Sequence, residues 1–329
     1  MIHPIPPGTR DVLPDEMREL RKLHVAMIDV FEGFGYGEVA TPAIEYDEVL
    51  SRGDGRAAAS GYRFFDESGD LLALRSEMTV PIARLVSTRF ADSETPIRLC
   101  YLANAFRAVR PQRGQMREFA QVGVELIGAS APDGTAEVIE VLEAALDAAG
   151  LDRAVIGLGD ADLYRQLLAE LGVEGETRDS ILARLATHDL VGLEAELSEV
   201  VDDRDCETCV ALSQLRGGRE VLEEARAMGG PAVERATARI GETYEALAAR
   251  GAAERVRIDL GLLRDLGYYS GAILEVYDPA LGHVLGGGGR YDALMKRFGL
   301  DLPAAGFALY MERVHVAQME EEPRREEPS

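Results

Sequence analysis

The sequence contains few of the residues that would place it in a specialised class of protein. Its 329 residues include no tryptophan, three cysteines and only two lysines, Lys22 and Lys296. Three cysteines are too few for a disulfide framework and are typical of a reducing compartment. No apolar run approaches the length of a membrane span, and prolines interrupt the N-terminal stretch where a signal peptide needs a continuous apolar segment. We therefore expect a cytoplasmic protein that does not enter a membrane.

Positive charge is also scarce. The 58 aspartates and glutamates outnumber the 35 lysines and arginines, which gives a formal net charge of −23 at pH 7. Such a chain repels a polyphosphate backbone at long range. Nucleic acid is therefore not expected as the main partner, although a local basic cleft could still bind it.

Two of the three cysteines, Cys206 and Cys209, form the motif CETC. This motif could be half of a zinc site or a redox pair, but the sequence has no second CxxC, and the nearest histidine, His188, lies well upstream. The more ordinary interpretation is a pair of structural cysteines at positions i and i+3 on one face of a helix. We expect no metal site.

The pattern of apolar residues predicts an α+β protein. Helical spacing is seen over residues 15–34 and 135–149, whereas residues 62–74 and 95–128 each read as two strands joined by a turn. Strands resume near residues 256–260 and 271–278, and an apolar helix is predicted through residues 306–314. Antiparallel hairpins followed by segregated helices favour an α+β core over a doubly wound sheet.

The region between residues 166 and 252 is predicted to be almost entirely helical. A helix-only block that interrupts strand-rich sequence indicates an inserted helical subdomain. It divides the core into two parts, residues 1–165 and 253–318. The remaining residues, 319–329, are strongly charged and are expected to be a disordered tail.

Four consecutive glycines occupy positions 286–289. They lack the GxGxxG spacing and the βαβ surroundings that give a dinucleotide fingerprint its meaning. The simpler interpretation is a backbone that approaches a ligand or another strand closely, which glycine permits.

Six segments are together similar to one family. In chain order they are GTRDVLP (8–14), LRSEMTVPIAR (74–84), FRAVRPQRGQMREFAQVGVELIG (106–128), LLRDLGYYSGAILEVY (262–277), GGGGRYDALMKRFG (286–299) and PAAGFALYMERV (303–314). They resemble the catalytic core of the histidyl-tRNA synthetases over almost the whole chain. The resemblance implies a class II synthetase core, an antiparallel sheet flanked by helices, which carries a helical insertion and forms a homodimer through the region around Pro42.

The resemblance also implies a pocket for the amino acid histidine. In the family, such a pocket uses carboxylates for the α-ammonium and ring N–H groups, an arginine for the α-carboxylate, and tyrosines as an apolar wall with hydroxyl groups. The positions of this sequence that match the family's histidine-binding residues are Glu77, Arg107, Gln121, Glu125, Arg264, Tyr268, Tyr269 and Tyr291.

The nucleotide side departs from the family pattern. Val109 stands between Arg107 and Arg110, where the synthetases have a glutamate that accepts a hydrogen bond from adenine. Tyr310 stands where they have a glycine that keeps the floor of the nucleotide site open. Asp265, beside Arg264, also replaces a glycine, and its carboxylate could partly neutralise that arginine. We interpret Val109, Tyr310 and Arg313 as remnants of a nucleotide site, and we expect no catalytic residues and no cofactor.

A final departure concerns length. Histidyl-tRNA synthetases continue beyond the segment matching residues 303–314 into an anticodon-binding domain, whereas here only a short polar tail follows. The synthetase paralogues without that domain are regulatory subunits of ATP phosphoribosyltransferase, which opens histidine biosynthesis. This resemblance implies a non-catalytic chain, a short-form catalytic subunit as partner, a hetero-octamer, and histidine as effector, bound in the synthetase-like pocket or at a subunit interface. Two alternatives stay open: a truncated synthetase that forms histidyl-adenylate, and a stand-alone histidine-binding protein.

Overall fold

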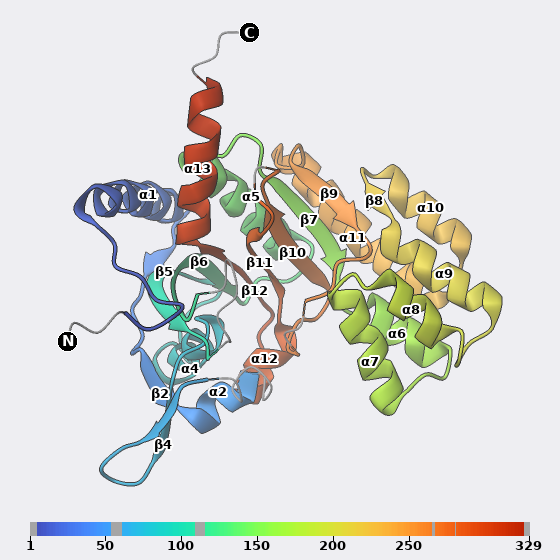
Figure 1. The fold of residues 1–329 in the computed structure, drawn as a ribbon, viewed down its shortest axis with the longest axis horizontal. Coiled ribbons are helices and arrows are strands. Elements are labelled where there is room, and N and C mark those ends of the chain that lie inside the picture. The colour runs from blue at the N-terminus through green and yellow to red at the C-terminus, as the bar shows by residue number, and fades with distance from the viewer. Residues whose placement is uncertain (1–4, 54–60, 109–115, 265–266, 280, 326–329) are drawn as a thin grey trace.

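The computed structural model describes residues 5–53, 61–108, 116–264, 267–279 and 281–325. Its centre is a sheet with the strand order β1-β5-β6-β12-β11-β10-β7-β9-β8. Neighbouring strands run antiparallel except in the pairs β1–β5 and β7–β9, which are parallel. Helices flank this sheet (Figure 1). The prediction of an α+β fold built on a largely antiparallel sheet is therefore confirmed.

The strands of the large sheet are β1 (Gly37–Glu38), β5 (Ile97–Phe106), β6 (Glu118–Ile127), β7 (Val155–Asp160), β8 (Arg216–Gly217), β9 (Val256–Asp259), β10 (Ala272–Tyr277), β11 (Val284–Arg290) and β12 (Ala304–Tyr310). A second sheet, with the order β2-β4-β3, consists of β2 (Ile44–Tyr46), β3 (Arg63–Phe65) and β4 (Leu71–Leu74). The predicted hairpins over residues 62–74 and 95–128 are the antiparallel pairs β3–β4 and β5–β6.

The helices are α1 (Pro14–Gly33), α2 (Asp47–Gly53), α4 (Thr79–Arg89), α5 (Asp133–Ala148), α6 (Leu163–Glu170), α7 (Gly175–Ala186), α8 (Leu190–Leu197), α9 (Asp203–Gln214), α10 (Glu220–Met228), α11 (Pro231–Arg250), α12 (Asp292–Arg297) and α13 (Met311–Arg325). Both helices predicted in the first half of the chain are present, as α1 and α5. Within the described residues, no helix is long and apolar enough to span a membrane.

The alternation of side chains along β6 separates the core from the site. Val122, Val124 and Leu126 belong to the main hydrophobic core, to which α1, α5 and α13 also contribute. Successive side chains of a strand point to opposite faces of the sheet, so Gln121 and Glu125 face away from these helices. One face of the sheet thus forms the core, and the other carries polar groups.

The region between residues 163 and 250 contains helices α6 to α11, of which α6 to α10 lie to one side of the sheet (Figure 1). The region is almost entirely helical, as predicted, and the one strand among its described residues is β8, which pairs with β9 at the edge of the sheet. An ion pair of 2.9 Å between Arg216 Nε and Asp259 Oδ2 reinforces that pairing. Apolar residues of these helices join the core cluster of the sheet. The domain boundaries proposed from the sequence stay a prediction.

The two structural cysteines occupy the positions expected of them. Cys206 and Cys209 lie on α9, and both side chains are buried in the hydrophobic core. Burial raises the pKa of the Cys209 thiol to about 12, which keeps it neutral and unreactive at physiological pH.

Two predictions near the C-terminus are wrong. The segment predicted as a helix through 306–314 is strand β12 as far as Tyr310, and its side chains alternate between the core and the opposite face. The tail expected to be disordered from residue 319 is helical to Arg325, the end of α13. Glu321 explains this order, because its buried carboxylate accepts the backbone N–H groups of Asp152 and Arg153 at 3.0 and 3.3 Å. Residues 326–329 lie outside the described part of the chain.

The glycine run forms β11, a central strand between β10 and β12. A Cβ atom at Gly286 would lie 2.2 Å from the carbonyl oxygen of Ala308, and one at Gly288 would lie 2.0 Å from that of Gly306. Only glycine fits such a close approach of backbones. The interpretation of the run as a place of close backbone approach is therefore confirmed.

Candidate functional site

A cavity lies on the face of the sheet that carries the polar groups. It is lined by side chains from the segment before α4, from β5, β6 and β12, and from the segment before β10, with glycines of β11 as its floor. The structure brings seven of the eight predicted histidine-binding residues to this lining, namely Glu77, Arg107, Gln121, Arg264, Tyr268, Tyr269 and Tyr291. The eighth, Glu125, is hydrogen bonded to the hydroxyl of Tyr291 and so lies directly behind the wall.

Glu125 is the most deeply buried carboxylate of this group, with 1% of its surface exposed. The Thr79 hydroxyl donates to its Oε1 at 2.8 Å, and the Tyr291 hydroxyl donates to its Oε2. Burial raises the pKa of Glu125 to about 8, since an ionised carboxylate loses its hydration there. At pH 7 the carboxyl is therefore held mainly in its neutral form until a cationic group binds beside it.

Glu77 has a double position. Its carboxylate accepts the backbone N–H groups of Thr79 at 2.7 Å and Val80 at 2.9 Å, and so caps the first turn of α4. The hydroxyl of Tyr268 lies 3.5 Å from Oε2, at the limit of a hydrogen bond. Burial raises the pKa of Glu77, although these backbone donors oppose the shift. Its carboxylate is thus both a helix cap and part of the cavity wall.

Gln121 presents a buried acceptor to the cavity. Its side chain is 4% exposed, and its Oε1 atom has no hydrogen-bond partner among the described residues. An unpartnered buried acceptor costs about 1–3 kcal/mol. A ligand that donates an N–H group here would remove that cost.

The aromatic wall is formed by three tyrosines that pack on one another. The ring centroids of Tyr268 and Tyr269 are 5.0 Å apart, and those of Tyr268 and Tyr291 are 6.1 Å apart at an interplanar angle of 81°. Such edge contacts hold the rings in fixed orientations. The wall is therefore well suited to a flat, partly apolar ligand group.

The opposite end of the cavity is basic and is occupied by Tyr310. Arg107 Nη1 lies 3.4 Å from the Tyr310 hydroxyl, and the Arg313 guanidinium carbon lies 4.6 Å from the centre of the Tyr310 ring. Phe119 packs edge-on against the same ring at 5.4 Å. Burial alone would raise the pKa of Tyr310, but Arg107, Arg264 and Arg313 outweigh it and lower that pKa. The phenol thus takes the place of an anion among arginines.

Arg264 lies across the glycine floor. Its Nη1 atom donates to the carbonyl oxygen of Leu274 at 3.1 Å, and it comes within 1.6 Å of where a Cβ on Gly287 would stand. With Arg264 and Tyr310 in these positions, the free volume of the cavity is about 30 Å³, enough for about two water molecules. An amino acid is larger than this volume, so it can enter only if side chains of the lining move.

The structure adds two residues that the sequence alone did not indicate. Thr79 donates to Glu125, and Tyr101 lines the cavity from β5, directly across the ladder from Gly123. Thr79 stands two residues after Glu77, but no spacing rule predicts its bond to a residue 46 positions later. Val109 and Asp265, two of the predicted departures from the family pattern, lie outside the described residues.

The family model described as histidyl-tRNA synthetase matches residues 8–314. A protein of Moorella thermoacetica named ATP phosphoribosyltransferase regulatory subunit is 42% identical over 97% of this chain and 83% of its own length. A protein of the same name from Carboxydothermus hydrogenoformans is 36% identical over 94% of this chain and 95% of its own length.

Solved structures are also similar to this chain over most of its length. A structure from Bacillus halodurans, described as an ATP phosphoribosyltransferase regulatory subunit/histidyl-tRNA synthetase, superposes with a TM-score of 0.87 at 33% identity, over 97% of this chain and 84% of that one. A histidyl-tRNA synthetase from Nostoc has a TM-score of 0.82 at 20% identity, over 97% and 76% of the two chains, which shows the fold alone.

The sheet, its flanking helices and the tyrosine-walled cavity define a protein with the class II fold of the histidyl-tRNA synthetases. The model match and the similarity to named relatives narrow this class. The chain belongs to the histidyl-tRNA synthetase-like family of ATP phosphoribosyltransferase regulatory subunits.

Proposed function

We propose that this chain is the non-catalytic regulatory subunit of ATP phosphoribosyltransferase, the enzyme of the first step of histidine biosynthesis, and that it acts in the cytoplasm. The short catalytic subunit requires it for activity, and histidine inhibits the complex through it. The single observation that carries this proposal is Tyr310, whose ring and hydroxyl occupy the basic end of the cavity beside Arg107. A synthetase needs that space for its nucleotide, whereas a regulatory subunit does not. The names of the relatives agree with this reading.

The tyrosine-walled cavity is the proposed site of the effector histidine. Glu125, Gln121 and Glu77 offer acceptors for the ammonium and imidazole N–H groups, and Arg264 or Arg107 offers donors for the carboxylate. The unpartnered Oε1 atom of Gln121 supports this assignment, because it lacks the donor that such a ligand would supply. Tyr268, Tyr269 and Tyr291 enclose the imidazole.

The small size of the cavity supplies a route for regulation. Histidine is larger than the free volume of about 30 Å³, so its binding displaces Arg264 or Tyr310. A ligand regulates only if it binds two conformations with different affinity, and about 1–3 kcal/mol of difference gives roughly 5- to 150-fold inhibition. In this proposal the two conformations differ in whether those side chains fill the pocket.

The small sheet is the proposed homodimer surface. Ile44, Tyr46 and Phe64 of the β2-β4-β3 sheet are 47%, 49% and 37% exposed. They share one face of the sheet, because Tyr46 and Phe64 both pair with Leu72 and Ile44 is two residues from Tyr46, and Ile44 follows Pro42 by two residues. Exposed apolar side chains gathered on one sheet are typical of an interaction surface. We propose that two chains pair here and that the dimers join four catalytic chains in a hetero-octamer.

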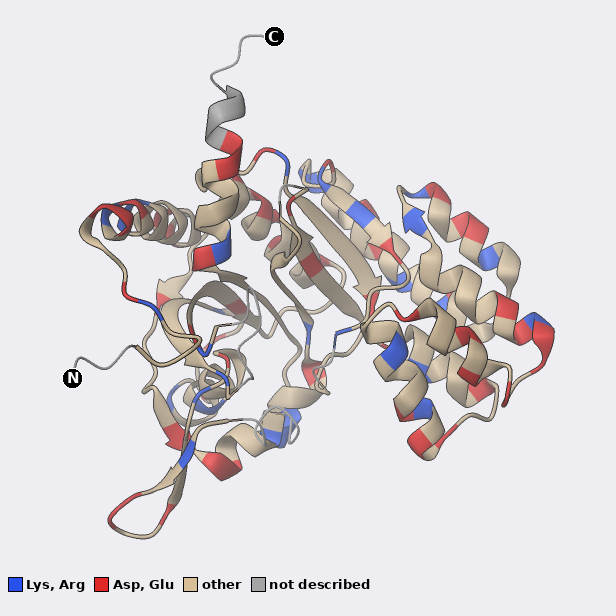
Figure 2. Ribbon diagram, in the orientation of Figure 1, with Lys and Arg blue, Asp and Glu red and all other residues tan. Residues whose placement is uncertain are grey.

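We propose no nucleic-acid partner. Acidic residues occur along α1 and on the helices α7 to α11, with basic residues interspersed among them (Figure 2). Many of these arginines are already engaged in ion pairs with those acids, for example Arg184 with Asp189 and Glu196. Together with the net charge of −23, this distribution disfavours phosphate binding.

The test is reconstitution. The full chain is mixed with its cognate short catalytic chain, and phosphoribosyl transfer to ATP is measured with and without histidine. We expect no activity from this chain alone, a strong rise on mixing, and a fall when histidine is added. A catalytic chain that is fully active alone and forms no complex at micromolar concentration contradicts the proposal.

One alternative has an observation in its favour. The acceptors of a histidine pocket are present, and a solved chain described as a histidine–tRNA ligase subunit from Alicyclobacillus acidocaldarius matches at 30% identity, with a TM-score of 0.83 over 98% of this chain and 99% of that one. A synthetase core would catalyse histidine-dependent exchange of pyrophosphate into ATP. Because Tyr310 occupies the nucleotide end, we expect none, and exchange above that of a blocked synthetase would favour the alternative.

A further inference from the structure

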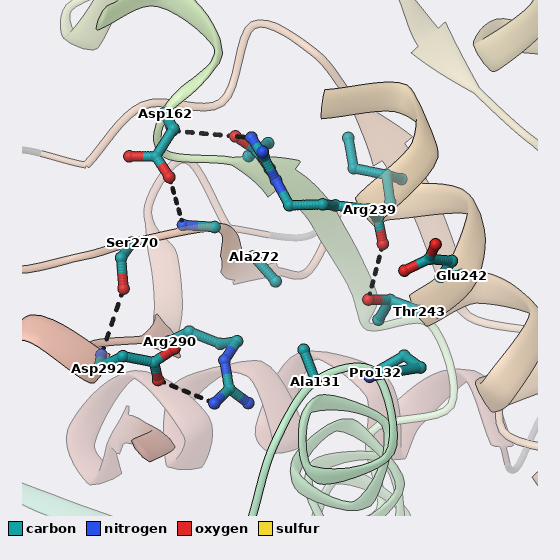
Figure 3. Close-up of a pocket in the computed structure, with 13 residues that line it drawn as sticks. Ala131, Pro132, Asp162, Arg239, Glu242, Thr243, Ser270, Ala272, Arg290 and Asp292 are labelled. Carbon is teal, nitrogen blue, oxygen red and sulfur yellow. Dashed lines mark hydrogen bonds and ion pairs between the residues drawn. The ribbon is translucent and has the colours of Figure 1, made fainter. Parts of the chain in front are cut away.

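A second and roomier cavity lies between helix α11 and the sheet. Its volume is about 220 Å³. Figure 3 shows its two sides, with Arg239, Glu242 and Thr243 of α11 facing the segments that carry Ser270, Arg290 and Asp292. Ala131 and Pro132, which precede α5, close a third side.

The carboxylates of this cavity outnumber its cations. Asp160 is paired with Arg239 through two hydrogen bonds of 2.8 Å, and its side chain is fully buried. Asp292 accepts from Arg290 at 2.8 Å. Four carboxylates, counting Asp162 and Glu242, therefore face two arginines. Asp162 accepts the backbone N–H of Gly271 but makes no ion pair with a described residue, and Glu242 has no described partner. Besides Asp160, which is hydrogen bonded to Arg239, Asp162 also lies close enough to raise the pKa of that guanidinium, so Glu242, at the solvent-exposed edge of the cavity, is the carboxylate left to attract a cation.

Arg290 gives the cavity an opposite, positive side. Its side chain is only 4% exposed, and three of its five N–H groups have partners: the Thr135 hydroxyl at 3.3 Å, the Ala129 carbonyl at 3.2 Å and Asp292. Its Nε atom is buried and has no partner among the described residues. A buried guanidinium with unused N–H groups is suited to a carboxylate.

We propose that this cavity binds a small zwitterion, an α-amino acid, with its ammonium group at Glu242 and its carboxylate group at Arg290. Neither a simple anion nor a simple cation satisfies both sides, because the unpaired Glu242 carboxylate and the unused guanidinium N–H groups line the same space. The volume lies below the roughly 300–1,000 Å³ of pockets for drug-sized molecules, which limits the ligand to one of amino-acid size. This site is separate from the tyrosine-walled cavity and does not depend on the function proposed for it.

The two cavities share two backbone segments. Tyr269 and Tyr291 line the first cavity, while their chain neighbours Ser270 and Arg290 line the second. The Ser270 N–H donates to the Arg290 carbonyl at 2.8 Å and ties these segments together. A ligand in the second cavity thus contacts direct chain neighbours of two residues that enclose the first.

Calorimetry on the full chain tests the proposal. Each of the twenty common L-amino acids is titrated into wild type and into Glu125→Gln, which alters only the first cavity. We expect at least one amino acid to bind both proteins. Its N-acetyl derivative and its α-amide, which each lack one charge, should bind about 10- to 100-fold more weakly.

The variant Glu242→Gln identifies the site. It should weaken that binding about 10- to 100-fold, whereas Glu234→Gln, on the same helix but outside the cavity, should leave it unchanged. If histidine itself is the ligand, two molecules bind per chain, and Glu125→Gln and Glu242→Gln each weaken one site. Circular dichroism checks that all variants fold. The proposal fails if no amino acid binds Glu125→Gln, if the two helix variants behave alike, or if the singly charged derivatives bind as well as the zwitterion.

Discussion

The two ends of the tyrosine-walled cavity differ in how far their polar groups are already satisfied. At the acidic end, the Oε1 atom of Gln121 has no hydrogen-bond partner among the described residues. The Glu125 carboxyl, whose pKa is raised to about 8, accepts hydrogen bonds from two hydroxyl groups. At the basic end, the Tyr310 ring and hydroxyl already stand among three arginines. The acidic end lacks a hydrogen-bond donor that a ligand could provide, whereas at the basic end the Tyr310 side chain already fills the space that a ligand would occupy. In the function proposed above, the acidic end is the amino-acid site that a synthetase-like fold keeps, and the basic end is the former nucleotide site, which Tyr310 fills.

We expect the largest effect from a substitution in the glycine floor, because it disrupts both ends of the cavity together. In Gly288→Ala the new Cβ would lie 2.0 Å from the Gly306 carbonyl oxygen, and neither backbone can move without breaking the sheet. We expect the free energy of unfolding to fall by about 5 kcal/mol or more. Urea denaturation measures it. Gly282→Ala is the control, because a Cβ there meets no atom within 4 Å. Equal losses in the two variants would contradict the role given to the glycine floor.

The next largest effect is the pH dependence of stability, which reports on the acidic end alone. The folded-state pKa of Glu125, about 8, is higher than its value in the unfolded chain, so the folded protein holds this proton more tightly. Its contribution to stability is therefore fully present below about pH 4.5 and is lost as pH rises to 8. At about 1.4 kcal/mol per pH unit, the loss is at most roughly 5 kcal/mol.

Glu125→Gln tests this expectation, because the amide does not titrate. Denaturation curves from pH 5 to 8.5 should be flatter for the variant than for wild type. Histidine binding to wild type at pH 7 should also release a proton, since the ligand's ammonium favours the ionised carboxylate. Calorimetry in buffers of different ionisation enthalpy detects it. Parallel pH curves for the two proteins would show that Glu125 is ionised throughout.

A smaller effect opens the basic end. Tyr310→Gly removes the ring that packs on Phe119 and lies beside Arg107 and Arg313, and we expect it to destabilise the fold by about 2 kcal/mol. Without the Tyr310 ring beside them, Arg107 and Arg313 can contact phosphate groups. We therefore expect the variant to bind ATP measurably and wild type not to bind it. Equilibrium dialysis with labelled ATP measures it. Tyr310→Phe is the control, since it removes the hydroxyl and keeps the ring. If both variants bind ATP equally, the hydroxyl rather than the ring closes this end.

We expect the smallest effect from the contact between the Tyr268 hydroxyl and the Glu77 carboxylate in the cavity wall. The Tyr268 hydroxyl is 3.5 Å from Glu77, so the interaction is weak in the ligand-free protein. Tyr268→Phe should change the free energy of unfolding by less than about 0.5 kcal/mol. Thermal unfolding is sufficient to measure it. A loss above about 1.5 kcal/mol would mean that this hydroxyl supports the carboxylate that caps α4.

Helices and strands were predictable from the sequence where apolar residues kept a single helical or strand spacing over a long stretch. The regular spacing of α1 and α5 and the two hairpins were predictable for that reason. The segment through 306–314 was not, because a short apolar run fits a helix or a buried strand equally well. Strand β8 was missed because it has two residues and exists only through its pairing with β9.

The site divides in the same way. Matching motifs indicated the residues of the first cavity, but no motif gives a free volume, and Arg264 lying over Gly287 was visible only in three dimensions. The second cavity was not predicted at all. Its Asp160 and Arg239 are 79 positions apart, and neither belongs to a recognisable motif.

The glycine floor constrains how this protein can diverge. Carbonyl oxygens of the neighbouring strands and the Arg264 side chain occupy the space beside the four glycines of β11, at positions 286–289. Those four positions therefore do not accept even alanine. New ligand preferences have to arise from the side chains that reach over the strand, such as Arg264 and Tyr310. A lineage that inherits this sheet can therefore change what the pocket accepts without altering the surface on which the ligand rests.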